Sequence, residues 1–184
     1  MNKPEKVLKD IEKVAQQSRA LPIIGSQKGI VLERVIKEKQ PKLVLEIGAL
    51  VGYSSILMAK DMKKGKIVSI EVNKKNADAA KLNIKNSGLA DKVEVINGDA
   101  LEIIPTLDGP FDLVFIDANK EDYLNYLRAA EPKMTKNAVV IADNTGIFKD
   151  RLKDFLEYVR KSGMYKSEMH DFGFDAVEVS KKVK

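Results

Sequence analysis

Short apolar runs alternate with amphipathic segments along most of the chain. Each run is rich in Val, Ile and Leu and ends at or beside an acid or an amide. Such runs are typical of strands buried in a parallel sheet, whereas apolar residues three or four apart predict helices. The pattern predicts strands over residues 42–47, 66–71, 93–96, 111–117 and 138–144, and helices over residues 5–19, 27–39, 53–62, 73–87, 121–130 and 150–161.

The order of these elements predicts the fold class. Strict alternation of strand and helix favours an α/β fold in which helices cover both faces of a mostly parallel sheet. The last two strands, near residues 164–169 and 176–180, have no helix between them and are expected to form an antiparallel hairpin at one edge. Ligands bind such sheets beyond the carboxyl ends of the strands, which is where the polar residues fall.

Length and composition limit the classes of protein to consider. The 184 residues are expected to form a single domain, 1–184, with N-terminal helices (1–40) that cover the site and a core (41–184). The net charge is +5, but lysines and acids are mixed throughout, which favours a solvated surface over a nucleic-acid groove. The absence of cysteine excludes disulfides and thiolate metal sites. The lack of a long apolar stretch and of a signal-peptide pattern predicts a cytoplasmic protein without membrane contact.

A glycine-containing loop follows the first predicted strand. It reads Glu46-x-Gly48-x-x-x-Gly52, and a helix is expected to begin just after it. Glycine lets the backbone turn sharply and a ligand come close, and the first helical N–H groups would point at that ligand. Dinucleotide sites use G-x-G-x-x-G, but Leu50 stands where the second glycine would admit a pyrophosphate. The spacing favours S-adenosylmethionine bordered by Gly48 and Gly52, with a plain strand-to-helix connection as the alternative.

Two further positions fit an adenosine-containing ligand. Glu71 lies about twenty residues beyond the glycine loop, at the end of the second strand, where an acid can accept both ribose hydroxyls. Asp99 and Ala100 follow the third strand and would border the adenine, with Asp99 as acceptor for the exocyclic amine. The alternatives are a surface glutamate and an exposed aspartate in a turn.

Three oxygen-bearing side chains end the fourth and fifth strands. Asp117 follows the fourth strand, beside the predicted cofactor loop, and Asp143 and Asn144 follow the fifth. A few hard oxygen ligands that leave positions open for water and substrate suit Mg²⁺ or another divalent cation and disfavour zinc. The pattern therefore predicts a magnesium site. The alternatives are that Asp117 caps the next helix and that the other two residues form a turn.

Lys120 is the predicted general base. It stands three residues after Asp117, at the start of a helix, where a positive charge is unfavourable. Beside a metal ion and partly desolvated, an amine gives up its proton more readily and can accept one from a substrate. The alternative is a flexible surface lysine. His170, the only histidine, has no partner in the sequence pattern and receives no catalytic role.

Together these motifs resemble one protein family. The specific pieces are Leu45–Gly48 with Gly52–Ser54, Ile70–Asn73, Asp117–Lys120 and Ala142–Asn144. With them the chain resembles the catechol O-methyltransferase-like and caffeoyl-CoA-type methyltransferases, which are cation-dependent and use S-adenosylmethionine. The resemblance implies a Rossmann-like class I methyltransferase fold, in which a seven-stranded sheet has its final strand reversed.

The resemblance also implies roles for individual residues. The methionyl part of the cofactor would be held by Glu46, Gly48 and Ser54 with the backbone of Ile24. The remaining roles agree with those given above for Glu71, Asp99, Ala100, Asp117, Asp143, Asn144 and Lys120. Two departures concern the acceptor: Ala118 and Asn119 replace the histidine and tryptophan of catechol-specific members, and the acid that contacts their second catechol hydroxyl has no assignable counterpart.

The sequence therefore predicts a cation-dependent O-methyltransferase that acts on a catechol-like or other small phenolic hydroxyl. One alternative keeps the chemistry and takes a hydroxylated uridine of transfer RNA as acceptor. Another, from a different class, is a nicotinamide-dependent oxidoreductase or a nucleotide-binding module without catalysis. The expected partner is a small hydroxylated aromatic molecule, and the sequence permits a homodimer.

Overall fold

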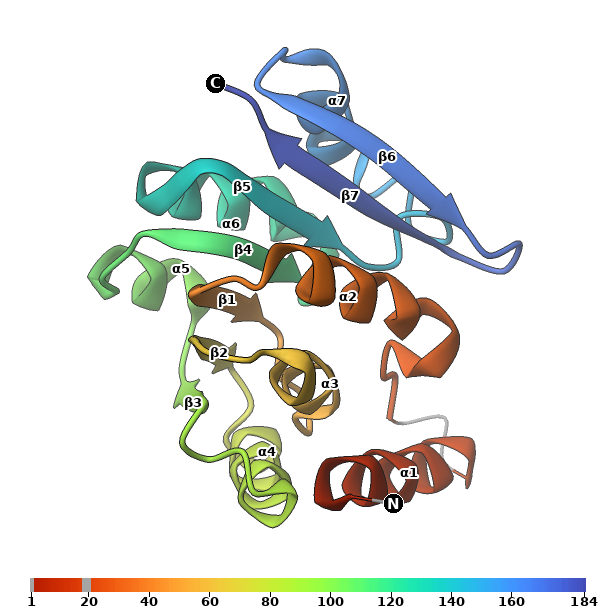
Figure 1. Cartoon of the computed structure of the whole chain (residues 1–184). Coiled ribbons are helices and arrows are strands. Elements are labelled where there is room, and N and C mark those ends of the chain that lie inside the picture. Colours follow the sequence, from red (N-terminus) through yellow and green to blue (C-terminus); the bar gives the residue numbers. More distant parts are fainter. Residues whose placement is uncertain (1, 18–20) are drawn as a thin grey trace.

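A computed structural model describes residues 2–17 and 21–184, which form one seven-stranded sheet between layers of helices (Figure 1). The strands are β1 Leu43–Ile47, β2 Lys66–Glu71, β3 Val93–Asn97, β4 Phe111–Ile116, β5 Met134–Ala142, β6 Tyr165–Asp171 and β7 Ala176–Lys182. The helices are α1 Lys3–Gln17, α2 Gly25–Lys39, α3 Tyr53–Asp61, α4 Lys74–Ser87, α5 Ala100–Ile103, α6 Tyr123–Ala130 and α7 Lys153–Lys161. Among the residues described, no helix has the length and apolar character needed to cross a membrane.

The sheet has the predicted mostly parallel topology. Its strand order is β3-β2-β1-β4-β5-β7-β6, with parallel pairing from β3 through β5. β7 lies between β5 and β6 and is antiparallel to both, so the predicted hairpin at the edge is confirmed. From β1 the chain adds β2 and β3 toward one edge of the sheet, and then β4 and β5 toward the other edge. A crevice for ligands is expected beyond the carboxyl ends of β1 and β4, where this order switches.

Two apolar clusters hold the helices against the two faces of the sheet. One cluster contains side chains of α1, α2, α3 and α4, and the other contains side chains of α6 and α7. Figure 1 shows these helices on either side of the sheet. β4 supplies both, because Leu113 and Phe115 face one layer while Val114 and Ile116 face the other. All four side chains are fully buried. A strand buried on both faces reads as the continuous apolar run seen in the sequence.

The boundaries of α4 follow local signals in the sequence. The side chain of Asn73 accepts hydrogen bonds from Lys75 N (2.9 Å) and Asn76 N (3.2 Å) at the start of α4, and Gly88 ends this helix in the left-handed conformation (φ 75°). The short helix α5 was not predicted, because four residues are too few for a helical repeat of apolar positions. The predicted first helix extended to residue 19, and its last two residues lie outside the described ones.

A buried lysine joins three distant parts of the chain at the carboxyl edge of the sheet. Lys28 on α2 is 5 % exposed, and its Nζ lies 2.7 Å from Asp143 Oδ1 and 2.5 Å from Asp175 Oδ2. Asp143 follows β5 and Asp175 precedes β7. Burial acts to lower the pKa of Lys28, but the two carboxylates outweigh this effect and raise the pKa above its usual value. The ammonium therefore keeps its charge. The ion cluster therefore fastens α2 and the edge hairpin to the end of β5.

Lys28→Met is expected to destabilise the fold by about 3–5 kcal/mol, because it leaves two buried carboxylates without their cation. Methionine keeps the length and the apolar stem of the side chain. The measurement is urea unfolding in EDTA, so that no divalent ion can replace the ammonium. Lys74→Met is the matched control, since Lys74 and Asp78 form an exposed pair on α4 and should contribute little. A loss no larger than that of the control would contradict the role given to Lys28.

Candidate active site

The main cavity opens beyond the carboxyl ends of the parallel strands and has a volume of about 810 Å³. Residues that follow β1, β2, β3, β4 and β5 line it, together with Pro22–Ile24 from the segment before α2. The predicted site residues found in its wall are Ile24, Gly48, Ser54, Glu71, Asp99, Ala100, Asp117, Lys120 and Asn144. Those outside the wall are Glu46, Gly52 and Asp143.

The two glycines of the loop are required by packing within the chain. Gly48 has a φ of 99°, and a Cβ atom there would collide with the carbonyl oxygen of Asp117 at the end of β4. Gly52 has a φ of 83°, and a Cβ atom would lie 3.3 Å from the backbone of Ala80 on α4. The sharp turn expected at the two glycines is thus present, and the close approach of a ligand stays a prediction. Leu50 also adopts a positive φ (48°), a conformation that costs energy for a residue with a side chain.

Glu46 lies beneath the glycine loop and not in the cavity wall. Its side chain is fully buried and accepts hydrogen bonds from the hydroxyls of Ser54, Ser55 and Ser69, the last at 2.6 Å. Burial raises the pKa of Glu46, and the three hydroxyl bonds oppose this shift. Glu46 therefore holds the start of α3 against β1 and β2. Direct contact with a cofactor stays a prediction.

Glu71 joins the end of β2 to the glycine loop. Its Oε2 accepts a hydrogen bond from Leu50 N (2.8 Å) and its Oε1 accepts one from Asn73 N (2.9 Å). An ionised carboxylate can accept about four hydrogen bonds, so two further acceptor positions are available toward the cavity. Glu71 thus combines a structural role with the capacity to bind a pair of hydroxyls.

Asp99 stands at the start of the short helix α5. Its side chain accepts a hydrogen bond from Leu101 N at 2.7 Å and so caps α5. Asp99 is exposed and Ala100 is buried, and both line the cavity beside Glu71. The carboxylate has one oxygen engaged in the cap, which leaves the other for a ligand.

Lys120 is held inside the cavity. Its Nζ donates to Asp117 Oδ1 at 2.9 Å and to Tyr123 Oη at 2.8 Å, and its side chain is only 12 % exposed. The Tyr123 hydroxyl in turn donates to the carbonyl oxygen of Asp143 at 3.3 Å. These contacts exclude a flexible surface lysine. The alternative that Asp117 caps the next helix is not supported. Its side chain accepts a hydrogen bond from Lys120, and the two helical turns that follow, at Lys120–Asp122 and Tyr123–Ala130, begin without a side-chain cap.

The register of the sheet places the two predicted metal-binding acids side by side. Ile116 pairs with Ala142, so Asp117 and Asp143 follow at equivalent positions of adjacent strands. Asp143 is 1 % exposed, and its pKa is raised to about 7, first by burial and then by the charge of Asp117, although Lys28 acts to lower it. Asp117 is half-buried and Asp143 buried, and their carboxylate oxygens are of the type that Mg²⁺ binds.

Other contacts at this edge already engage part of the predicted ligand set. No group of three or more His, Cys, Asp or Glu side chains arranged to bind a metal occurs in residues 2–17 and 21–184. Lys28 contacts Asp143, and the Asn144 amide donates to Asp175 Oδ2 at 2.9 Å. The side-chain amide oxygen of Asn144 and the carboxylates of Asp117 and Asp143 are donors of the type that Mg²⁺ binds. The metal site therefore stays a prediction based on donor type.

Sequence reasoning missed several residues of the site. Asp175 reaches the site from the loop between β6 and β7. Its Oδ1 accepts hydrogen bonds from Ile147 N (3.1 Å) and Gly146 N (3.3 Å), and these bonds hold the loop after β5 in place. No local pattern marks this acid, because its partners are far away in the sequence. Lys28 did carry a signal, since it is a charged residue on the apolar face of a predicted helix. Phe148 and Arg151 line the cavity from a loop without a motif.

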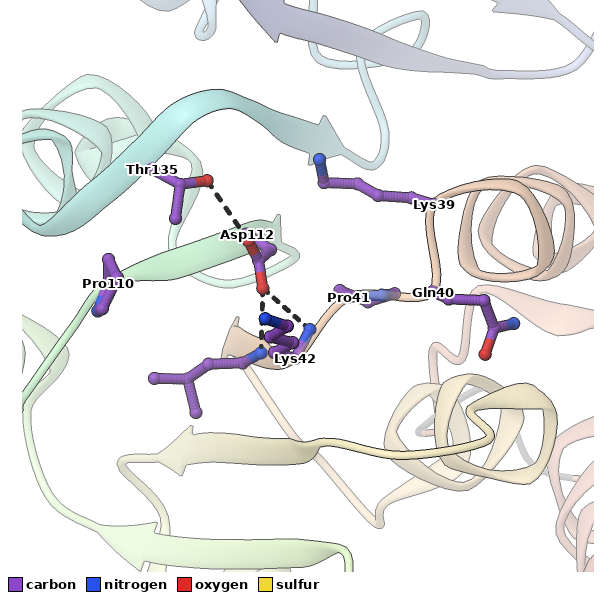
Figure 2. A pocket seen from close by; sticks show the side chains of 8 residues that line it. Lys39, Gln40, Pro41, Lys42, Pro110, Asp112 and Thr135 are labelled. Atoms are coloured by element: carbon purple, nitrogen blue, oxygen red, sulfur yellow. Dashed lines mark hydrogen bonds between the residues drawn. The ribbon is translucent and has the colours of Figure 1, made fainter.

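A second cavity, of about 430 Å³, lies at the opposite edge of the sheet, where β1 and β4 begin (Figure 2). The acid in its wall, Asp112, accepts hydrogen bonds from Lys42 N (2.7 Å) and Leu43 N (3.2 Å), and also from the Thr135 hydroxyl (3.3 Å). These bonds join the starts of three strands. The acid is therefore structural, and the site described above is the stronger candidate for catalysis.

Comparison with known proteins agrees with this geometry. A family model described as "O-methyltransferase" matches residues 2–160. Catechol O-methyltransferase of Mycobacterium tuberculosis is 42% identical over 123 residues, which are 66% of this chain and 56% of that protein. The catechol O-methyltransferase of Bos taurus is 32% identical over 170 residues (88% and 62%), and caffeoyl-CoA O-methyltransferase 2 of Petunia hybrida is 30% identical over 149 residues (77% and 61%). The chain thus spans less than two thirds of the length of these relatives.

Solved structures share the fold over nearly the whole chain. The cofactor-bound Rv0187 from MTB superposes with a TM-score of 0.86 at 29% identity and covers 99% of this chain and 90% of that one. TomG of Streptomyces achromogenes, an O-methyltransferase in complex with SAM, gives 0.84 at 27% identity (97% and 90%). The predicted class I methyltransferase fold is therefore confirmed. Since the family model matches most of its length, the chain belongs to the O-methyltransferase family.

Proposed function

We propose that the chain transfers the methyl group of S-adenosylmethionine to a hydroxyl oxygen of a catechol-like or other small phenolic acceptor, with the help of a divalent cation. The observation that carries the proposal is the pair formed by Lys120 and Asp117 inside the cavity that the glycine loop also lines. A base, an acid and a loop suited to an adenosyl ligand meet there. Family membership and the SAM complex of TomG support the donor.

The donor would occupy the part of the cavity between the glycine loop and α5. Glu71 has acceptor capacity for the ribose hydroxyls, and Asp99 for the exocyclic amine of adenine. Gly48, Ser54 and the backbone of Ile24 would enclose the methionyl part. These contacts orient the sulfonium so that its methyl group points toward Asp117 and Lys120, which raises the rate by proximity.

The acceptor would lie on the other side of Asp117, with its reacting hydroxyl at Lys120. Lys120 in its neutral form takes the hydroxyl proton, the oxygen forms a bond to the methyl carbon, and the electron pair of the broken carbon–sulfur bond stays on sulfur. Tyr123 holds the amine in place through its hydroxyl. Because opposite charges cancel as the methyl group moves, a wall that excludes water favours the transfer.

A divalent cation would be held by Asp117, Asp143 and the amide oxygen of Asn144. When bound, it would supply Lewis acidity and a template for two adjacent oxygens of the acceptor. Asp117 would then hold the Lys120 ammonium less strongly, which favours the neutral amine. The raised pKa of Asp143 and its position beside Asp117 in the sheet support this ligand set.

The charges at the mouth of the cavity favour a small acceptor over transfer RNA. Asp99 and Asp122 line the cavity together with Lys120 and Arg151, so its wall carries both signs of charge and is not a basic groove for a phosphate backbone. The oxidoreductase alternative has no support from the family to which the chain belongs.

Removal of divalent ions is expected to abolish methyl transfer to 4-methylcatechol, because the acceptor loses its template and Lys120 stays paired with Asp117. The measurement is turnover with labelled S-adenosylmethionine after EDTA treatment, with metal content checked by mass spectrometry. Activity should return with Mg²⁺. Full turnover in verified metal-free protein would contradict the metal role.

Lys120→Ala should lower kcat by about 100-fold or more, in the range of general-base catalysis. Binding of S-adenosylmethionine, followed by calorimetry, should stay within about twofold, because the lysine lies on the acceptor side of Asp117. Lys75→Ala, at an exposed position of α4, is the control. Wild-type turnover in Lys120→Ala would reject this residue as the base.

Calorimetry with S-adenosylmethionine and NAD, side by side, tests the donor. We expect binding of S-adenosylmethionine alone, since Leu50 occupies the position at which a dinucleotide loop has its second glycine. Comparable heats from NAD would revive the oxidoreductase alternative.

A further inference from the structure

The acceptor side of the cavity contains a second cation beside Lys120. Phe148 and Arg151 line this side, on the loop between β5 and α7. Both cations lie near the Phe148 ring, whose centroid is 5.7 Å from Lys120 Nζ and 5.4 Å from Arg151 Cζ. The two charges can therefore be separated by at most the sum of these distances, about 11 Å.

Arg151 has donors to spare. Its Nε donates a hydrogen bond to Glu121 Oε1 at 2.6 Å, and its guanidinium donates no other hydrogen bond within the described part of the chain. A guanidinium carries five N–H donors, so both terminal nitrogens are open to a ligand. The side chain is 48 % exposed, whereas that of Lys120 is 12 % exposed. Arg151 thus stands at the mouth and Lys120 deeper inside.

The nearby acids leave room for an anion at Arg151. Glu121 is 59 % exposed, so its pair with Arg151 is screened by water and easily shared. Asp122 also lines the cavity, but its two oxygens accept hydrogen bonds from Asn119 (2.7 Å) and Asn125 (3.1 Å). A planar carboxylate matches the two terminal nitrogens of a guanidinium, which Glu121, bound at Nε, leaves open.

We propose that Arg151 is a specificity-determining residue that selects hydroxylated aromatic acids as acceptors. The inference rests on the proposed function: the hydroxyl lies at Lys120, the ring packs beside Phe148, and the carboxylate pairs with Arg151. The short distance between the two cations favours a carboxylate attached to the ring directly or through one carbon. The acceptor class is thus narrower than small phenols in general.

The experiment compares two acceptors of similar size, 3,4-dihydroxybenzoate and the neutral 4-methylcatechol, in steady-state methyl transfer. For the wild type we expect the lower KM with the benzoate. Arg151→Gln should raise that KM by about tenfold or more, while the KM for the neutral catechol should change by less than about twofold. Arg151→Lys keeps the charge but loses the paired terminal nitrogens, so its KM for the benzoate should lie between those of the wild type and Arg151→Gln. Glu121→Gln should lower the KM for the benzoate, because Arg151 loses its competitor.

Arg128→Gln is the matched control, since Arg128 also stacks on an aromatic ring (Tyr158, 5.6 Å) but does not line the cavity. Equal changes for both acceptors in Arg151→Gln, or no change for the benzoate, would overturn the inference while leaving the proposed function intact. If the wild type methylates neither acceptor, the proposed function fails instead. Calorimetry of 3,4-dihydroxybenzoate with wild type and Arg151→Gln then decides the inference: a weakening of about tenfold supports it, and equal affinity overturns it.

Discussion

The contact between the backbone of Gly48 and the carbonyl oxygen of Asp117 is the feature that determines the geometry of the site. It joins the ends of β1 and β4, where the order of the strands reverses, and it tolerates no side chain. Through it the loop that would bind the donor touches the segment that carries Lys120. A methyl donor and an acceptor hydroxyl can meet only if these two segments are adjacent, so the packing of the sheet determines the geometry of the reaction.

The same edge gathers more negative charge than a protein interior tolerates without compensation. Glu46 is compensated by three hydroxyl donors, and Asp143 and Asp175 share the ammonium of Lys28. Asp117 is paired with Lys120. The bonds from Lys28 and Asn144 also hold the pKa of Asp175 below its usual range, although burial acts to raise it. Each acid is thus held in one orientation, which is what a pre-organised site requires.

Sequence patterns are sufficient for the parts of the molecule that are specified locally. The apolar runs predict the five parallel strands, Asn73 and Gly88 predict the ends of α4, and the parallel topology brings Asp117 and Asn144 to one cavity. The pairing of Lys28 with Asp175 spans 147 residues and could not be predicted, because nothing near either residue refers to the other. The family resemblance implies that Glu46 is a cofactor ligand, but the sequence does not show which way its side chain faces. The structure places Glu46 under the loop, where it is buried.

A crystal structure with S-adenosylhomocysteine, Mg²⁺ and a catechol bound would decide whether donor and acceptor meet as proposed. We expect the sulfur atom of the product beside Gly48 and a catechol oxygen within hydrogen-bond distance of Lys120 Nζ, on the opposite side of Asp117. An adenosyl group outside the cavity, or a catechol bound away from Lys120 while the donor site is filled, would show that the proposed arrangement is wrong.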